Sequence, residues 1–379
     1  MDNNFNEFSA NNDVRVGEDF TTSLPVYYLS LNSAFYHYFQ TFRDNKDRYH
    51  FLCMDIKSWN REDIAFNFTT DYNLVFTILG FHRFVELLVK DILRNINPLL
   101  AVKFSGKEKD LFSYCDSKTE EERIEAKQIN TIEYSETFRR FNRAYKHYDK
   151  TSDIYINHLK NYEFIIQQEN AETLQLLSDW RNRIMHNGNK FPNILYFDYL
   201  ISQRVIPIID KIIKLENIYL GKYEPHFYQT STGIKVIDKI LEIKFSYKDF
   251  SNDKKSKELG FKLMNLAHLK EIGRVAYKQD AFTKSNNARF ETSYVDPKAR
   301  SERFALAENA NVDFLKVKQC ICCGNNSLVV YKKKFNFKLF AKEDNYIKWF
   351  KCYHCDYALI DNIGEPKYFG LTEVTLFEE

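Results

Sequence analysis

The chain has 379 residues and a mass of 45.3 kDa, more than one typical domain, so we expect two or three folded units. Its 54 lysines and arginines nearly balance 52 acidic residues, and the formal net charge of +2 excludes a globally basic nucleic-acid binder. The hydrophobic fraction of 44% excludes a disordered chain, and only 11 glycines and 7 prolines disfavour a turn-rich β protein.

We expect no export signal in the first residues of the sequence. No basic segment followed by an apolar run is present, and we expect no apolar stretch long enough to span a bilayer. Four of the seven cysteines form two close pairs, which in a chain without a signal favours metal binding over disulfides. We therefore expect a cytoplasmic protein with no membrane partner.

Predicted helices fill the first half of the chain. Residues 1–22 are polar and rich in asparagine, as in a flexible arm, and a Tyr- and Phe-rich helical segment follows from Pro25 to about Phe42. Residues 74–90 repeat apolar positions at helical spacing, with Glu86 among them. Mixed charges over about 98–130 indicate a solvated insertion, and aromatic residues mark further helical stretches from 131 to 168.

The segment 180–188, Trp-Arg-Asn-Arg-Ile-Met-His-Asn-Gly, sets three polar functional groups at the end of a predicted helix. Apolar residues at 174, 177, 180 and 184 mark its buried face, and Gly188 predicts its end. His186 then lies in the last turn, where the negative end of the helix dipole interacts favourably with a cation. Asn182 shares a face with His186, whereas Arg181 lies about 140° away around the axis.

This set of residue types suits RNA cleavage without a metal. The reaction needs a base for the ribose 2′-hydroxyl, an acid for the leaving 5′-oxygen and cations for the phosphorane, which histidine and arginine provide. Arg181 and His186 of one chain point in different directions and are poorly placed to contact one phosphate together. Two copies related by a twofold axis would line one cleft with two arginines and two histidines. The alternative is a histidine that caps helix carbonyls and an arginine in a surface ion pair.

The pattern Arg181-Asn182-x-x-x-His186 resembles the signature of the HEPN superfamily of helical ribonucleases and nucleotide-binding proteins. The helix with Glu86 is similar to the long first helix of that family, which often carries an acidic residue midway. The apolar-periodic segment 193–220 resembles the closing helix of its bundle. The likeness spans roughly residues 60–220, and Gly188 argues against the toxin subfamily that has Tyr at that position.

The resemblance implies a HEPN-like helical domain over residues 23–220, with the charged insertion at about 98–130. It also implies a metal-independent endoribonuclease that acts as a homodimer or higher oligomer. Arg181, Asn182 and His186 would be catalytic, and Glu86 would support them by orienting Arg181.

Residues 221–316 are predicted to form a helical connecting region. Helical patterns cover 233–244 and 254–277, and Ser285-Asn286-Asn287 indicates a loop within a polar stretch. We find no residue pattern there that points to chemistry.

Residues 317–379 contain a zinc-ribbon pattern and the C-terminal tail. Two C-x-x-C pairs are separated by 28 residues, and Gly324 follows the first pair, where a tight turn needs a residue that tolerates positive φ. Four thiolates saturate tetrahedral zinc, so the expected ion is a structural Zn²⁺ and catalysis needs no metal. Cys322 and His354 lie beside these ligands, and either could replace one. The expected ligands are Cys320, Cys323, Cys352 and Cys355.

Between the pairs we expect short strands over 327–334, 335–342 and 346–350. Residues 316–351 hold nine lysines against two acidic residues, which leaves a local charge of +7. Lysines interleaved with aromatic residues suit a strand that binds phosphates and stacks bases. The alternative is a small aromatic core kept soluble by its lysines. The residues expected to bind RNA are Lys332, Lys333, Lys334, Lys338 and Trp349.

Together these patterns predict a mainly α protein, with a HEPN-like bundle, a helical connecting region and a small β zinc ribbon. The expected function is an endoribonuclease that leaves a cyclic phosphate, by family analogy a toxin or antiphage defence effector. Its partners would be an RNA substrate, a second copy of the chain and a regulatory protein or trigger. The alternative is a non-catalytic RNA- or protein-binding scaffold built on a HEPN-like dimer and the ribbon.

Overall fold

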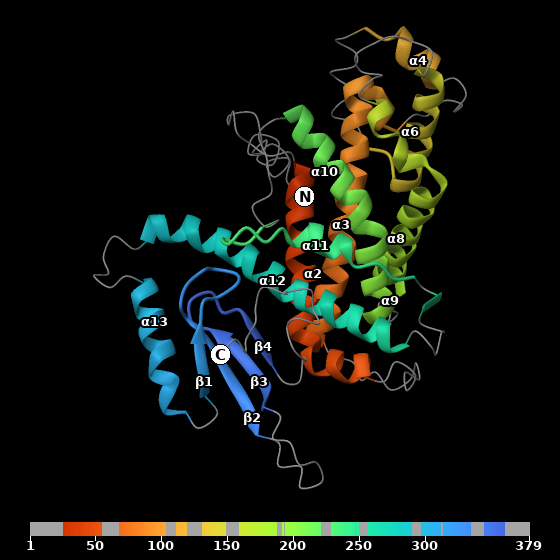
Figure 1. The fold of residues 1–379 in the computed structure, drawn as a ribbon. Coiled ribbons are helices and arrows are strands. Elements are labelled where there is room, and N and C mark those ends of the chain that lie inside the picture. Colours follow the sequence, from red (N-terminus) through yellow and green to blue (C-terminus); the bar gives the residue numbers. More distant parts are fainter. Residues whose placement is uncertain are drawn as a thin grey trace, which may run out of the picture. The chain divides into compact units, whose positions relative to one another are not determined.

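The protein is mainly helical, with a small antiparallel sheet near the C-terminus (Figure 1), which confirms the predicted fold class of helices plus a small β element. The elements group into two compact units, residues 1–34 with 78–166 and residues 35–77 with 167–379. The computed structural model describes residues 26–54, 68–103, 111–119, 131–148, 159–187, 192, 194–220, 229–246, 248–249, 256–289, 297–311, 314–334 and 345–360.

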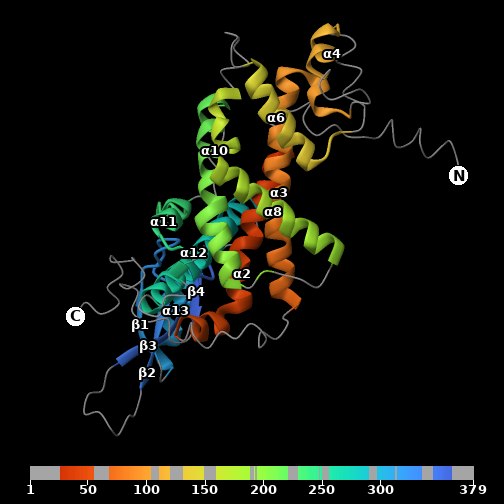
Figure 2. The same cartoon turned by 90° about the vertical axis from the view of Figure 1, so that its right-hand side faces the viewer.

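The first unit contains the beginning of α2 (Val26–Met54) and most of α3 (Phe68–Ile96). Gly80 of α3 faces Ala34 of α2, where an added Cβ would lie 2.8 Å from that of Ala34, so only glycine permits this close approach. Arg140, which lies on a later helix of this unit, donates to the carbonyls of Leu100 (3.0 Å) and Val102 (2.7 Å). The shorter helices, which include α4 and α6 beside the C-terminal half of α3 (Figure 2), are η2 (Pro98–Ala101), α4 (Leu111–Ser117), α6 (Tyr134–Tyr148) and η5 (Glu163–Ile166).

The second unit contains the rest of α2, the first residues of α3 and then α8 (Gln168–Asn187). The single helix predicted over 193–220 is α9 (Ile194–Tyr199), a π-helical turn η6 (Leu200–Val205) and α10 (Ile206–Leu220). The short α11 (Val236–Glu242) and the long α12 (Ser256–Arg289) follow. Gly273 of α12 lies against Phe39 of α2, where an added Cβ would meet the ring at 2.5 Å, so these two helices also pack closely.

The sheet joins four strands in the order β1-β2-β3-β4, all antiparallel. Helix α13 (Pro297–Ala307) covers one face, where Ala305 packs with Val329 and Tyr331. The sequence predicted neither α13 nor the outer strands β1 and β4, whose short length leaves little periodicity to detect. The strand bounds are β1 (Phe314–Lys318), β2 (Leu328–Lys334), β3 (Asn345–Cys352) and β4 (Ala358–Ile360).

The helix predicted over 254–277 continues as α12 to Arg289, so the loop predicted around Ser285–Asn287 is wrong. Extending an existing helix requires no new nucleation, and the neighbouring lysines and alanines are good helix formers that outweigh three turn-favouring residues. The predicted arm 1–22, the helix stop Gly188 and the strand predicted over 335–342 lie outside the described residues.

One described segment, Tyr72–Ile96 in α3, is long and apolar enough to cross a membrane by length and composition alone. The expectation that no stretch reaches this length is therefore wrong. Of its apolar window, 61% is buried inside the protein, as in a helix that belongs to a packed core.

Candidate functional site

Helix α8 carries the Arg181–His186 motif. Of its predicted apolar stripe, Leu174, Leu177 and Ile184 are buried and Trp180 is half-buried. Its first turns are attached to η6, because Arg204 donates to Thr173 Oγ1 (3.0 Å) and to the Glu169 carbonyl (3.2 Å) and pairs with the Glu169 carboxylate (3.1 Å). The N-terminal half therefore fixes the helix, and the motif occupies its other end.

The motif end of α8 is exposed in the single chain. Asn182 and His186 are exposed one turn apart, and between them Met185 leaves 56% of its surface open to solvent. Arg181 is half-buried, and its Nη1 donates to Asn182 Oδ1 at 2.9 Å. Arg181 is thus held against the side chain that lies one turn before His186.

Glu86, the predicted supporting acid, lies half-buried on α3 in the first unit. It accepts a hydrogen bond from Lys90 Nζ at 2.6 Å, and its other oxygen is 3.8 Å from His82 Nδ1. Both partners are four residues away on the same helix, the ordinary spacing of an intrahelical ion pair. That Glu86 orients Arg181 stays a prediction.

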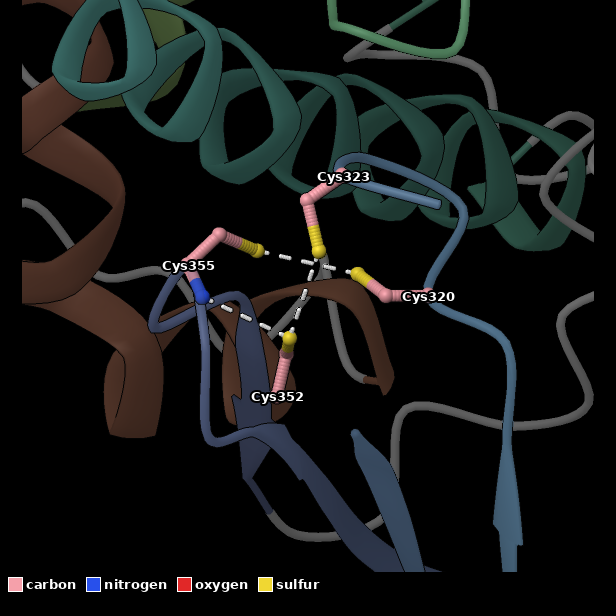
Figure 3. A group of neighbouring side chains, drawn as sticks. All are labelled: Cys320, Cys323, Cys352 and Cys355. Carbon is pink, nitrogen blue, oxygen red and sulfur yellow. Dashed lines mark hydrogen bonds between the residues drawn. The ribbon is translucent and has the colours of Figure 1, made fainter. Parts of the chain in front are cut away.

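The two cysteine pairs converge on one point (Figure 3). Four sulfurs bound at about 2.3 Å to one tetrahedral ion lie about 3.8 Å from each other. Here the Sγ atoms of Cys320 and Cys355 are 3.6 Å apart, and those of Cys323 and Cys352 are 3.7 Å apart. All four lie within 4.8 Å of one another, so these cysteines, the cysteine centre from here on, could hold one metal ion.

Two similar turns hold the cysteine pairs. In the first, the Cys322 N–H donates to Cys320 Sγ (3.4 Å) and the Gly324 N–H to the Cys320 carbonyl (2.9 Å). In the second, the Asp356 N–H donates to the Cys352 carbonyl (3.1 Å). Gly324 has φ +74° and Asp356 has φ 60°, so the residue after each pair is left-handed. The positive φ predicted for Gly324 is confirmed.

The two alternative ligands named from the sequence lie outside this group. Cys322 is buried, and burial raises the pKa of its thiol, which keeps it protonated at neutral pH. His354 Nδ1 lies 3.3 Å from Ser301 Oγ on α13. Among the described residues the sulfur cluster contains only the four cysteines that the spacing predicted.

The residues predicted to bind RNA lie on β2, on β3 and in the segment between them. In the register Lys332 pairs with Ile347, Lys333 with Tyr346 and Lys334 with Asn345, whereas Trp349 pairs with Tyr331. An irregularity between Tyr331 and Lys332 separates this lysine end from the rest of the strand. Lys338 lies outside the described residues.

Sequence reasoning missed two features of the cysteine centre. Asp356 takes the place in the second pair that Gly324 takes in the first, and comparing the two pairs would have found it. Polar side chains of α12 that contact the second turn left no signal, because charged residues within a helical pattern usually indicate a solvated face.

No protein-family model, curated protein or solved structure matches the chain.

His268 of α12 is expected to make the stability of the fold depend on pH. Its buried ring is hydrogen-bonded through Nε2 to the Tyr357 hydroxyl, and burial lowers its pKa to about 3. Because an unfolded histidine titrates near 6.5, the unfolded chain binds a proton between these two pH values that the folded chain does not. The free energy of unfolding is therefore expected to fall as the pH drops below about 6.5, by about 2 kcal/mol at pH 5. Denaturant unfolding measured between pH 5 and 7 tests this.

The matched variant is His268→Gln, which keeps a hydrogen-bonding side chain but cannot titrate. Its loss of stability between pH 7 and 5 is expected to be smaller than that of the wild type by the same amount. Identical pH slopes for the two proteins would show that His268 does not control this dependence.

Proposed function

We propose that the protein is a metal-independent endoribonuclease whose active site is completed by a second copy of the chain. The supporting observation is that Asn182 and His186 are both exposed on α8, with Arg181 hydrogen-bonded to Asn182. One chain offers one imidazole of this kind, whereas the reaction uses an acid and a base at the same time. Two α8 helices related by a twofold axis would supply both.

The exposed Met185 fits this arrangement. It lies among the motif residues and is an apolar side chain left 56% open to solvent in the single chain. A twofold contact covers the same patch on both copies, so it would remove both Met185 side chains from water while bringing the two motifs together.

In the proposed reaction, one His186 accepts the proton of the ribose 2′-hydroxyl and the 2′-oxygen attacks the adjacent phosphorus. The bond from phosphorus to the 5′-oxygen breaks, and the protonated His186 of the second copy donates its proton to that oxygen. The Arg181 guanidinium stabilises the negative charge of the phosphorane, and Asn182 positions the phosphate. The products carry a cyclic phosphate and a free 5′-hydroxyl.

We propose further that the cysteine centre is a zinc ribbon that binds one structural Zn²⁺. Four thiolates would complete a tetrahedral shell, so bound zinc would join the two turns and leave no coordination position for a reactant. The lysines of β2, with Lys338 and Trp349, would bind the RNA substrate. A cytoplasmic toxin or antiphage effector, controlled by a partner or trigger, is the role that agrees with the HEPN resemblance.

Cleavage of labelled single-stranded RNA in EDTA tests the enzyme proposal, with bound zinc measured afterwards. His186→Ala is expected to slow cleavage by about 10²- to 10⁴-fold, because it removes both proton-transfer groups. Arg181→Ala is expected to slow it by about 10²- to 10³-fold. Wild-type products should resist phosphatase until acid opens the cyclic phosphate.

Arg183→Ala is the matched control. Arg183 is an exposed arginine of the same helix turn that stacks over Trp180 at 5.1 Å and has no proposed role in cleavage. It should cut RNA at close to the wild-type rate. Undiminished cleavage by folded His186→Ala would contradict the proposal, and tight RNA binding without any cleavage by the wild type would favour the scaffold.

A further inference from the structure

Helix α12 carries four ionisable side chains that are almost completely buried. Burying such groups is unfavourable unless each is hydrogen-bonded or paired, so their partners reveal what the helix holds in place. The proposed RNA chemistry uses none of them. They are His268, Lys270, Glu271 and Arg274.

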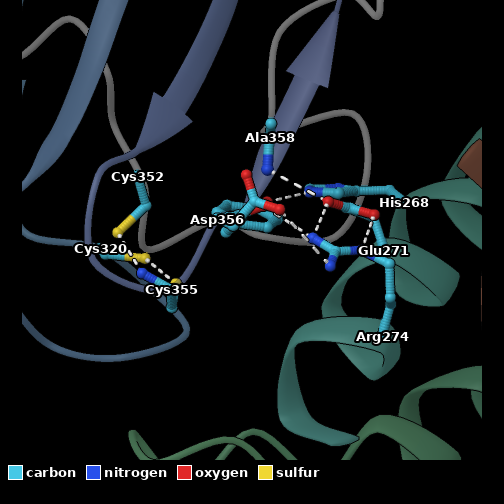
Figure 4. A network of polar contacts seen from close by, with 9 residues as sticks. His268, Glu271, Arg274, Cys320, Cys352, Cys355, Asp356 and Ala358 are labelled. Carbon is cyan, nitrogen blue, oxygen red and sulfur yellow. Dashed lines mark hydrogen bonds and ion pairs between the residues drawn. The ribbon is translucent and has the colours of Figure 1, made fainter. Parts of the chain in front are cut away.

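Three of the four side chains hold the turn that bears Cys352 and Cys355 (Figure 4). Arg274 Nη2 donates to the Asp356 carbonyl at 2.7 Å, and Nη1 is 3.9 Å from the Asp356 carboxylate. The Ala358 N–H donates to Glu271 Oε1 at 3.2 Å. His268 bonds to the hydroxyl of Tyr357, the residue between them. The three residues that follow Cys355 are thus each attached to α12.

Glu271 also orients Arg274. The guanidinium donates through Nε to Glu271 Oε2 and through Nη2 to Oε1, both at 2.7 Å, and neither side chain is exposed. Such a two-point contact fixes the plane of the guanidinium. This pair therefore sets the direction in which Arg274 donates to the Asp356 carbonyl. It thereby helps to fix the position of the second turn.

The fourth side chain ties α12 to the helical core. Lys270 forms a buried ion pair with Asp198 of α9 and donates to Thr41 Oγ1 of α2 at 3.1 Å. Its Nζ also lies 4.7 Å from the centre of the Tyr38 ring. Consecutive residues of one helix, Lys270 and Glu271, therefore contact the core and the cysteine-bearing turn.

We propose that Arg274 is a positioning residue for the metal and that α12 couples metal binding at the cysteine centre to the order of the helices it contacts. The inference rests on the proposed metal site, not on the ribonuclease. A metal that binds only the folded cysteine centre stabilises every element whose order the centre requires. Linkage is reciprocal. The factor by which bound metal stabilises the order of α12 is also the factor by which disorder in α12 weakens the affinity for the metal.

The first experiment measures Zn²⁺ affinity of the full chain by competition with a chromogenic chelator. Arg274→Met, which removes the donors and keeps the length, is expected to weaken binding by about 10- to 100-fold. Arg274→Lys keeps a donor and should lie between this variant and the wild type. With Co²⁺ in place of Zn²⁺, the thiolate absorption bands should shift in Arg274→Met, because a displaced turn distorts the tetrahedron.

Lys262→Met is the matched control. Lys262 lies on the same helix and pairs at 2.6 Å with Glu258, a residue exposed at the surface. Its removal should leave the Zn²⁺ affinity and the Co²⁺ spectrum unchanged. Wild-type affinity in Arg274→Met, or an equal loss in Lys262→Met, would overturn the positioning role.

The second experiment needs no variant and compares hydrogen exchange of the wild-type chain with Zn²⁺ and after its removal by chelator. Removal is expected to speed exchange in α12 and also at its contacts in α9 and α2. If the chain binds Zn²⁺ and exchange in α12 is unchanged, the coupling is wrong and the metal site stands. If the chain binds no Zn²⁺, the metal site itself is wrong and the coupling with it; RNA cleavage in EDTA is judged independently.

Discussion

Replacing Cys352 with serine is expected to abolish the proposed zinc binding and to disorder the β1–β4 sheet. Three thiolates and a hydroxyl bind zinc far more weakly than four thiolates, and structural zinc contributes about 10–16 kcal/mol in small zinc-dependent domains. The apolar cluster on the α13 side of the sheet is small, with Ala305, Val329 and Tyr331 fully buried in it. Such a cluster cannot replace that stabilisation. Zinc content per chain and protease sensitivity of the sheet measure the effect.

Cys322→Ser provides the control within the same turn. Cys322 is as buried as Cys352, but its sulfur lies outside the cysteine centre, so this variant should keep its zinc and its protease resistance with a modest loss of stability. Full zinc content in Cys352→Ser would remove that residue from the ligand set. Loss of zinc in both variants would point to a general packing defect.

Removing one member of the Lys270–Asp198 pair is expected to lower the free energy of unfolding by a large amount. Both side chains are fully buried, and Lys270→Met would leave the Asp198 carboxylate without its cation, at a cost of about 3–5 kcal/mol. Burial lowers the pKa of Lys270 and nearby Asp198 opposes this shift, so the pair depends on both members being present. Denaturant unfolding of the zinc-loaded chain measures the loss.

The double variant Lys270→Met with Asp198→Leu should recover most of that stability, because two apolar side chains replace two charges. The surface pair Lys239–Glu242, at 3.0 Å with both members well exposed, is the comparison, and Lys239→Met should change stability by less than about 1 kcal/mol. A double variant as unstable as Lys270→Met alone would show that the pair contributes through packing or other contacts.

The sequence by itself determined the features that depend on neighbours along the chain. Helical spacing predicted α3, α8 with its buried Leu174 and Leu177, and the beginning of α12. The two C-x-x-C pairs identified four cysteines whose sulfurs meet, and Gly324 marked a left-handed turn. Each of these signals is local, because helix periodicity, a tight turn and the chelate formed by two nearby cysteines involve residues a few positions apart.

Only the tertiary structure decided which distant groups meet. Lys270 pairs with Asp198, which is 72 residues away in the sequence, and donates to Thr41, which is 229 residues away. Arg274 donates to Asp356, which is 82 residues away. Nothing in the local pattern distinguishes these buried charges from the solvated face of a helix, because burial depends on the elements that cover a residue. Likewise β1 and β4 are too short to show periodicity and exist through pairing with β2 and β3. Long-range packing therefore selects, from many charged residues on an ordinary helix, the few that join the cysteine centre to the helical core.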